Sequence, residues 1–172
     1  MDPHHRSTTL TLVVLLIIAL QVTGFSTPYW QYEVQIGYMG LFTSCKIVEV
    51  LDRNYCTNDI NAIFKLPNDW VRVVISVESI AIILQVLAVV FLLTFHWKTR
   101  PNGYAKVSFL ILVVAGILGS IGVIVYGVKA DTDKLPLNWS FAFELVASCL
   151  GVIVGGLGYY FFMKPPDYLQ IN

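Results

Sequence analysis

Four long apolar runs, separated by more polar segments, are the main pattern along the chain. A bilayer core needs about 20 mostly apolar residues per helix, so each run is long enough to span a membrane. We therefore expect one domain, residues 1–172, with spans at residues 9–27, 71–95, 107–128 and 139–162. The loops between them are residues 28–70, 96–106 and 129–138.

The first loop has a different pattern from the runs around it. From Trp30 to Tyr38, apolar residues alternate with Gln, Glu and Gly. This period of two predicts a strand with one packed and one solvated face. Ile47, Val48 and Val50 suggest another strand.

Two cysteines flank this second strand. Cys45 and Cys56 are close enough in sequence to join neighbouring strands of a hairpin by a disulfide, a bond that persists only in an oxidising compartment. The loop therefore predicts a small disulfide-linked sheet held against the outer side of a membrane.

Composition agrees with a membrane protein. The 172 residues are 56% hydrophobic and 13% charged, with a mean hydropathy of +0.70, outside the usual range of soluble domains. The lipid bilayer is thus the expected surrounding. Zero net charge, without an acidic or basic tail, gives no indication of nucleic-acid binding.

Charge predicts the orientation of the spans. Residues 96–106 carry three basic residues and no acidic one, as is typical of a cytoplasmic loop. The acidic first loop then lies outside, where its cysteines can oxidise, and both termini are cytoplasmic in the plasma membrane. The alternative for the first run is a signal peptide cleaved after Gly24, although the run is long for one.

Two acidic residues, Glu78 and Glu144, interrupt the second and fourth spans at comparable depth in the outer leaflet. A charged residue at a helix centre costs roughly 2.5 to 3.5 kcal/mol on insertion scales. One interpretation is that each faces the bundle, protonated or hydrogen-bonded, and fixes the order of the helices. The other is an intramembrane polar site for a cation or a partner helix.

Small residues mark the third and fourth spans, including Gly116, Gly119, Gly151 and Gly155. Such residues let helix backbones approach closely in lipid, either within this bundle or against a second copy. Cys149 stands alone in the fourth span and is expected to be an inert core residue.

Catalytic motifs are missing from the sequence. It contains no CxxC, no HExxH and no glycine-rich phosphate loop, and its three histidines lack a carboxylate constellation. We therefore expect a protein that is not an enzyme and that needs no cofactor and no metal.

The spans, the cysteine pair, Trp30 and the segment Gly40-Leu41-Phe42 together resemble the W…GLW…C…C signature of the claudin and peripheral-myelin-protein superfamily. Phe42 stands where the family usually has tryptophan. Arg72 resembles the arginine that claudins carry at the start of their second span. The start of the fourth span and the compact size are more similar to the epithelial membrane proteins than to barrier-forming claudins.

This resemblance implies a fold: an all-α membrane four-helix bundle with a small extracellular antiparallel β-sheet, to which the second loop can add one strand. It also implies self-association in one membrane or between two. The leading hypothesis is a protein that organises cell–cell contacts or membrane apposition. Apolar contact would come from the sheet residues Tyr29, Trp30, Tyr32, Tyr38 and Met39, although these side chains can also rest on lipid headgroups.

Two other functions stay open. In the first, copies polymerise into a paracellular ion barrier or channel, and the acidic loop residues Glu49, Asp52 and Asp59 favour cations. In the second, the chain is an auxiliary subunit that escorts an ion channel or a receptor. Permeability across a monolayer tests the first, and copurification of a stoichiometric partner tests the second.

Overall fold

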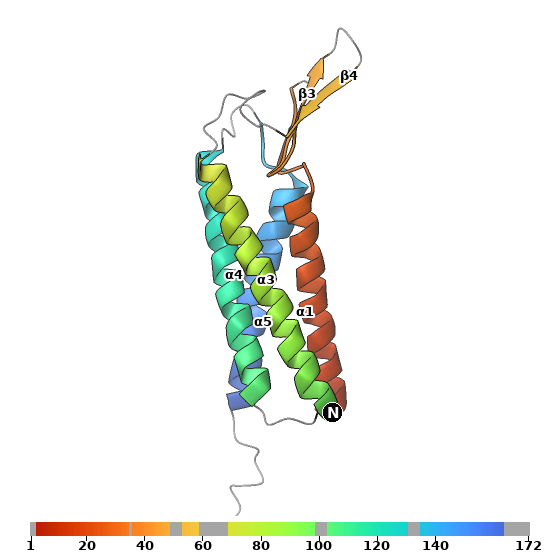
Figure 1. Cartoon of the computed structure of the whole chain (residues 1–172), viewed down its shortest axis with the longest axis vertical. Coiled ribbons are helices and arrows are strands. Elements are labelled where there is room, and N and C mark those ends of the chain that lie inside the picture. The colour runs from red at the N-terminus through yellow and green to blue at the C-terminus, as the bar shows by residue number, and fades with distance from the viewer. Residues whose placement is uncertain are drawn as a thin grey trace, which may run out of the picture.

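Four long helices, labelled α1, α3, α4 and α5 in Figure 1, form the body of the protein. The computed structural model describes residues 3–34, 36–48, 53–58, 69–98, 103–130 and 135–163. Within these ranges the helices are α1 (Pro3–Ser26), α3 (Asp69–Lys98), α4 (Gly103–Lys129) and α5 (Trp139–Met163). Each contains a segment long and apolar enough to cross a membrane.

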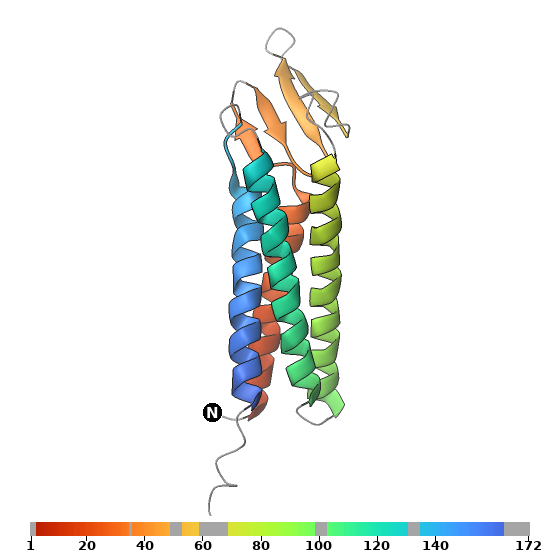
Figure 2. The same cartoon turned by 90° about the vertical axis from the view of Figure 1, so that its left-hand side faces the viewer.

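All the strands stand at one end of this bundle, which we call the sheet end (Figure 2). Helix α1 begins and α5 finishes at the opposite end. At the sheet end α1 stops at Ser26, two residues before Pro28, because proline cannot continue a helix. The start of α5 is capped by Asn138, whose side-chain oxygen accepts a hydrogen bond of 2.8 Å from the Trp139 backbone N–H.

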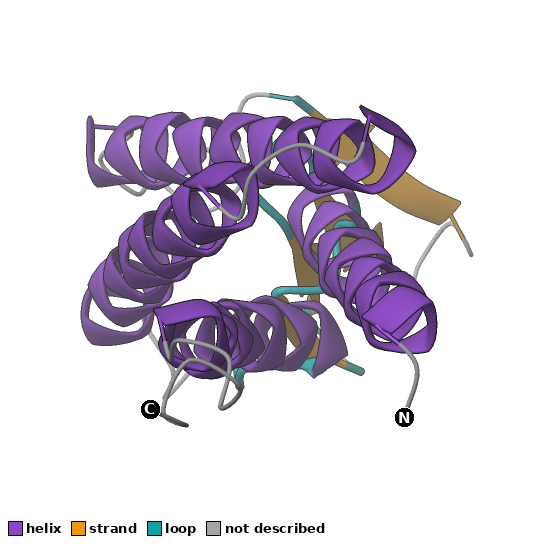
Figure 3. Ribbon diagram, turned by 90° about the horizontal axis from the view of Figure 1, so that it is seen from below, coloured by secondary structure: helices purple, strands orange, loops and turns teal. Residues whose placement is uncertain are grey.

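The helices form a four-membered ring. Helix α4 packs along α3 on one side and along α5 on the other, and α1 closes the ring between α5 and α3. The view along the bundle shows that α3 and α5 face each other across its centre (Figure 3). Any contact between α3 and α5 must therefore be made by long side chains that reach inward.

Glycines bring α4 and α5 into close contact. A Cβ atom on Gly116 would lie 2.7 Å from the Ser148 carbonyl oxygen, and one on Gly155 would lie 2.9 Å from the Phe109 carbonyl oxygen. These small residues therefore pack inside this bundle, as one of the two interpretations predicted.

Large aliphatic side chains point away from the centre. Residues exposed by more than half of their surface occur on all four helices, for example Leu16, Ile83, Ile124 and Ile153. This distribution suits lipid as the surrounding solvent. Cys149 is also exposed, so the prediction of a core cysteine was wrong: the helix register turns it outward.

The sheet has four short antiparallel strands in the order β1-β2-β3-β4. They are β1 (Gln31–Glu33), β2 (Gly37–Met39), β3 (Ser44–Val48) and β4 (Arg53–Thr57). The bundle of four helices with a small antiparallel sheet confirms the predicted fold class.

The single strand predicted from Trp30 to Tyr38 is instead a hairpin. The chain turns after Glu33, whose carbonyl accepts a hydrogen bond from the Ile36 N–H at 3.2 Å. Gly37 makes the return possible: its φ is 136°, and a Cβ atom there would lie 2.0 Å from the Cys45 carbonyl oxygen. Alternation alone cannot locate this reversal, because it continues through both arms.

The predicted strand around residues 47–50 is β3, which begins earlier, at Ser44, and is described to Val48; Val50 lies outside the described residues. In the second loop, the extra strand expected is reduced to one bridge between Gln31 and Leu137. The Tyr32 N–H donates to the Pro136 carbonyl at 3.1 Å. This segment thereby covers the edge of β1.

Candidate functional site

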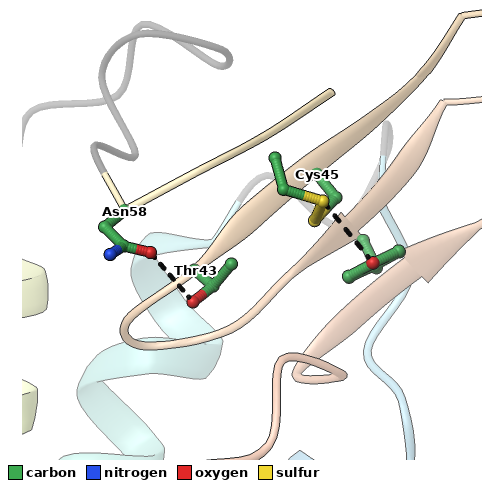
Figure 4. The surroundings of a disulfide bond; sticks show 5 residues. Thr43, Cys45 and Asn58 are labelled. Carbon is green, nitrogen blue, oxygen red and sulfur yellow. Dashed lines mark hydrogen bonds between the residues drawn. A yellow bond between two sulfur atoms is a disulfide. The ribbon is translucent and has the colours of Figure 1, made fainter. Parts of the chain in front are cut away.

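The disulfide joins the last two strands of the sheet. Cys45 on β3 and Cys56 on β4 are directly opposite each other and are joined. Beyond them the Thr43 hydroxyl donates to the Asn58 side-chain oxygen at 3.4 Å (Figure 4). The covalent link and the strand register together fix this hairpin as a rigid unit.

Trp30 attaches the sheet to the helices. Its side chain is fully buried, and its indole N–H donates to the Gly24 carbonyl on α1 at 2.8 Å. Its ring lies 4.5 Å from the ring of Tyr126 on α4 and 5.9 Å from that of Phe141 on α5, measured between centroids. One side chain thus connects the start of β1 to three helices.

The segment Gly40-Leu41-Phe42 forms the turn between β2 and β3 and rests on the bundle. A Cβ atom on Gly40 would lie 2.5 Å from the Pro28 Cα, so only glycine fits this close approach. Leu41 is buried with Val71 at the start of α3.

Phe42 is 43% exposed and lies with its ring centroid 5.0 Å from that of Phe25, edge to face. An aromatic side chain therefore packs on the end of α1 at this position, although it is less buried than Trp30. Arg72 is exposed near the start of α3, where it lines a groove of about 430 Å³ with Leu41, Phe42, Thr43, Asn58, Val71 and Ile75.

A cluster of partly exposed aromatic rings lies beside the disulfide, and we call it the aromatic patch: Tyr29, Tyr32, Tyr38 and Trp139. Centroid distances from Tyr29 to the other three rings are 6.5 Å, 5.1 Å and 5.4 Å, in that order. Register places Tyr32, Tyr38, Cys45 and Cys56 in one row across the four strands.

Trp30 and Met39 do not belong to this patch. They are 0% and 1% exposed, so the prediction that they supply intermolecular contact was wrong. Both face the helices, because the inner face of the sheet covers the apolar ends of the bundle. Only the three tyrosines of the predicted set remain available at the surface.

A second group of interest is buried between the helices near the sheet end. We call it the polar cluster: Gln21 on α1, Glu78 and Gln85 on α3, and Glu144 and Ser148 on α5, each 0% exposed. Glu78 and Glu144 therefore both face the bundle interior. Sequence reasoning singled out these two acids and missed the other three residues, although a lone Gln in an apolar run was a visible signal.

Hydrogen bonds run in one direction through the polar cluster. The Gln85 amide donates to the Gln21 side-chain oxygen, and the Gln21 amide donates to Glu78 Oε2 at 3.1 Å. Glu144 adjoins both Glu78 and Gln21. Five buried oxygens of the cluster nevertheless have no hydrogen-bond partner in the described part of the chain: Glu78 Oε1, Gln85 Oε1, both Glu144 carboxyl oxygens and Ser148 Oγ.

The acidic residues predicted to select ions, Glu49, Asp52 and Asp59, lie outside the described residues. Their role stays a prediction. Within the ranges that the structure describes, no group of three or more His, Cys, Asp or Glu side chains that could hold a metal ion is found.

The family model described as PMP-22/EMP/MP20/Claudin family matches residues 7–158. This range contains all four helices, apart from the first residues of α1 and the last residues of α5, and the whole sheet. Among curated proteins, no significant match was found.

Proposed function

The chain belongs to the PMP-22/EMP/MP20/claudin family, and from this premise we propose that it organises cell–cell contacts or membrane apposition through its sheet. It is a multi-pass membrane protein. In our proposal it resides in the plasma membrane with the sheet outside and both termini in the cytoplasm. It acts without catalysis, by self-association in one membrane or between two.

Two features support this orientation. The joined Cys45 and Cys56 require an oxidising compartment on the sheet side of the membrane. Helix α3 ends and α4 begins at the end away from the sheet, and the sequence 96–106 carries three basic residues and no acidic one. Positive charge in a short loop favours the cytoplasmic side.

The aromatic patch is the observation that carries the contact role. Tyrosine and tryptophan rings supply large contact area at low entropic cost and are enriched at protein interfaces. Here they are partly exposed on or beside a sheet whose inner face is fixed to the bundle by Trp30. A surface held rigid in this way loses little conformational freedom when it meets a partner.

The free edge of the sheet offers a second contact surface. Among the described strands, β4 pairs on one side only, with β3. Its unpaired backbone groups can add a strand from another chain, as in β-augmentation. Self-association through the sheet is therefore compatible with both the patch and the edge.

Non-adherent cells that express the tagged chain provide the test. We expect the protein to concentrate where two expressing cells touch, relative to borders with non-expressing cells. Tyr32→Ser, which removes one ring of the aromatic patch, should reduce this enrichment at equal surface amount. Lys46→Ser is the matched control, because Lys46 is exposed on the same sheet but is not part of the patch.

Enrichment of the wild type must be judged only after surface delivery is verified. Wild-type protein that reaches the surface and spreads evenly over contact and non-contact membrane would contradict the proposal. Equal enrichment of the wild type and Tyr32→Ser would show that the aromatic patch does not mediate it.

A further inference from the structure

The polar cluster has too few hydrogen-bond donors in position for its acceptors among the described residues. All five of its unpartnered buried atoms are oxygens, and four of them belong to carboxyl or amide groups. An ionised carboxylate accepts hydrogen bonds but cannot donate them, and the same is true of an amide oxygen. The Gln85 amide donates to Gln21 and the Gln21 amide donates to Glu78, so neither of these two hydrogen bonds ends on Glu144.

The cluster also lacks positive charge. The buried polar side chains of the described residues include no Lys, Arg or His. Helix α1 contributes Gln21 and Gly24 here, and α4 contributes Gly119 and Gly122. Among the described residues, the basic residues nearest in sequence are Arg72 and Lys129, and both are exposed at the sheet end. Two adjoining carboxylates would therefore stand uncompensated in a medium where unpaired charge is unfavourable.

Glycines of α1 and α4 lie close to the side-chain oxygens of the polar cluster. A Cβ atom on Gly122 would lie 2.2 Å from Glu78 Oε1, and one on Gly24 would lie 2.6 Å from Glu144 Oε2. On Gly119 it would lie 2.4 Å from Ser148 Oγ. Glycine backbone thus occupies the space beside these oxygens. A proton needs no additional room, whereas a metal cation needs several oxygens arranged around it.

We propose that Glu78 and Glu144 form a proton-binding site within the membrane-spanning bundle. Glu144 carries the proton, because neither of its carboxyl oxygens has a hydrogen-bond partner in the described part of the chain, and donates it to the Glu78 carboxylate. The proton is taken from water and returns to water when it is released. It supplies the missing donor, removes one negative charge and links α3 to α5, the two helices that face each other across the ring.

Infrared spectroscopy of the purified full-length chain in lipid nanodiscs tests the site directly. We expect the carbonyl stretching band of a protonated carboxyl group at neutral pH in the wild type and in Glu33→Gln. Glu33 is the control because it lies on β1, outside the helices. Glu144→Gln should abolish the band.

Several spectra would overturn the proposal. One is the absence of the band from folded wild-type protein, and another is a band unchanged in Glu144→Gln. A band that only Glu78→Gln removes would overturn the assignment of the proton to Glu144. The wild-type spectrum and Glu78→Gln keep the test decisive if Glu144→Gln does not fold.

Thermal unfolding distinguishes a bound proton from a bound metal cation at this site. We expect the wild-type melting temperature to fall from neutral to alkaline pH, because loss of the proton leaves two adjoining carboxylates. Glu144→Gln should reduce this fall, since its amide donates a hydrogen bond at any pH. A melting temperature that rises with sodium chloride but not with choline chloride, and only when Glu144 is present, would mean a bound metal cation and would overturn the proposal.

Discussion

The buried indole of Trp30 is a point where one side chain connects several elements. Removal of the ring leaves a cavity between β1, α1, α4 and α5 and leaves the Gly24 carbonyl without its donor. We expect Trp30→Ala to lower the free energy of unfolding by about 3–5 kcal/mol, as for other buried large aromatic residues. Trp30→Phe, which mainly loses the hydrogen bond, should cost about 1–3 kcal/mol.

Equilibrium unfolding in mixed micelles, followed by tryptophan fluorescence and circular dichroism, measures these differences. Trp139→Phe is the control, because Trp139 is 38% exposed and should change the free energy by less than about 0.5 kcal/mol. Equal effects of Trp30→Phe and Trp139→Phe would contradict the assigned role of the indole N–H.

Side-chain environment explains which residues of the candidate sites were predictable. Glu78 and Glu144 are conspicuous because an acid in an apolar span needs an explanation in any fold. Trp30 was recognisable as a family residue, but its burial depends on contacts with Tyr126 and Phe141, far along the chain. Such long-range contacts leave no periodic signal, and this is why Trp30 was wrongly expected at the surface.

Among the elements, the contact between α4 and α5 depends on the absence of side chains at particular positions. Gly116→Ala would place a methyl group 2.7 Å from both the Ser148 carbonyl oxygen and the Val152 backbone nitrogen, so the helices must separate. We expect a loss of about 1–3 kcal/mol in the free energy of unfolding, the usual cost of overpacking.

Gly156→Ala is the matched control on the same pair of helices. A Cβ atom there meets nothing within 4 Å, and alanine is the better helix former by roughly 1 kcal/mol in water. This variant should be neutral or slightly stabilising in the same unfolding assay. If Gly156→Ala destabilised the protein as much as Gly116→Ala does, the loss could not be attributed to the close contact between α4 and α5 at Gly116.

The β3–β4 hairpin provides a further test at the scale of elements. We expect the double variant Cys45→Ser, Cys56→Ser to destabilise the hairpin by about 2–4 kcal/mol, since the disulfide closes a loop with a sequence separation of 11. The helices retain their own packing, so limited proteolysis should cut the first loop faster while helical circular dichroism stays near that of the wild type.

Cys149→Ser should leave both measurements unchanged, because Cys149 is a free, exposed cysteine. Equal proteolysis rates for the wild type and the double variant would mean that the strands hold their register without the bond.

The helices could be predicted from the sequence more completely than the strands. Each long apolar run is sufficient to specify a membrane helix, so the four helices were predictable. The hairpin of β1 and β2 was not, because its turn depends on the positive φ of Gly37 and on the fit of that residue against Cys45. Alternation specifies which face a residue occupies, but it does not specify where the strand reverses.

In the whole molecule, most of the buried polar side chains of the described residues lie toward the sheet end. In the polar cluster, Glu78 and Glu144 lie about 7–14 Å below the starts of their helices, at 1.5 Å of rise per residue. Above it, Trp30 and Tyr126 close the bundle, and above these stands the sheet. The other end has an apolar core that includes Val14, Leu92 and Phe109. The molecule is thus asymmetric along its axis, and its orientation in the membrane determines what the sheet can contact.

Helix α4 allows this orientation to be measured with two positions on one element. Gly103 and Lys129, its first and last residues, are both exposed. The helix has 27 residues and is therefore about 40 Å long, more than the roughly 30 Å of a bilayer core. A cysteine at each end, introduced separately into Cys149→Ser protein, therefore reports on opposite sides of the membrane.

We expect a membrane-impermeant maleimide to label Lys129→Cys on intact cells and to leave Gly103→Cys unlabelled until the cells are permeabilised. The reason is that the basic linker of residues 96–106 favours the cytoplasm, while the disulfide of the sheet requires an oxidising exterior. Labelling of Gly103→Cys alone on intact cells would place the sheet inside the cell. In that case neither the aromatic patch nor the edge of β4 could meet a neighbouring cell, and the contact role would have to be abandoned even though the fold is unchanged.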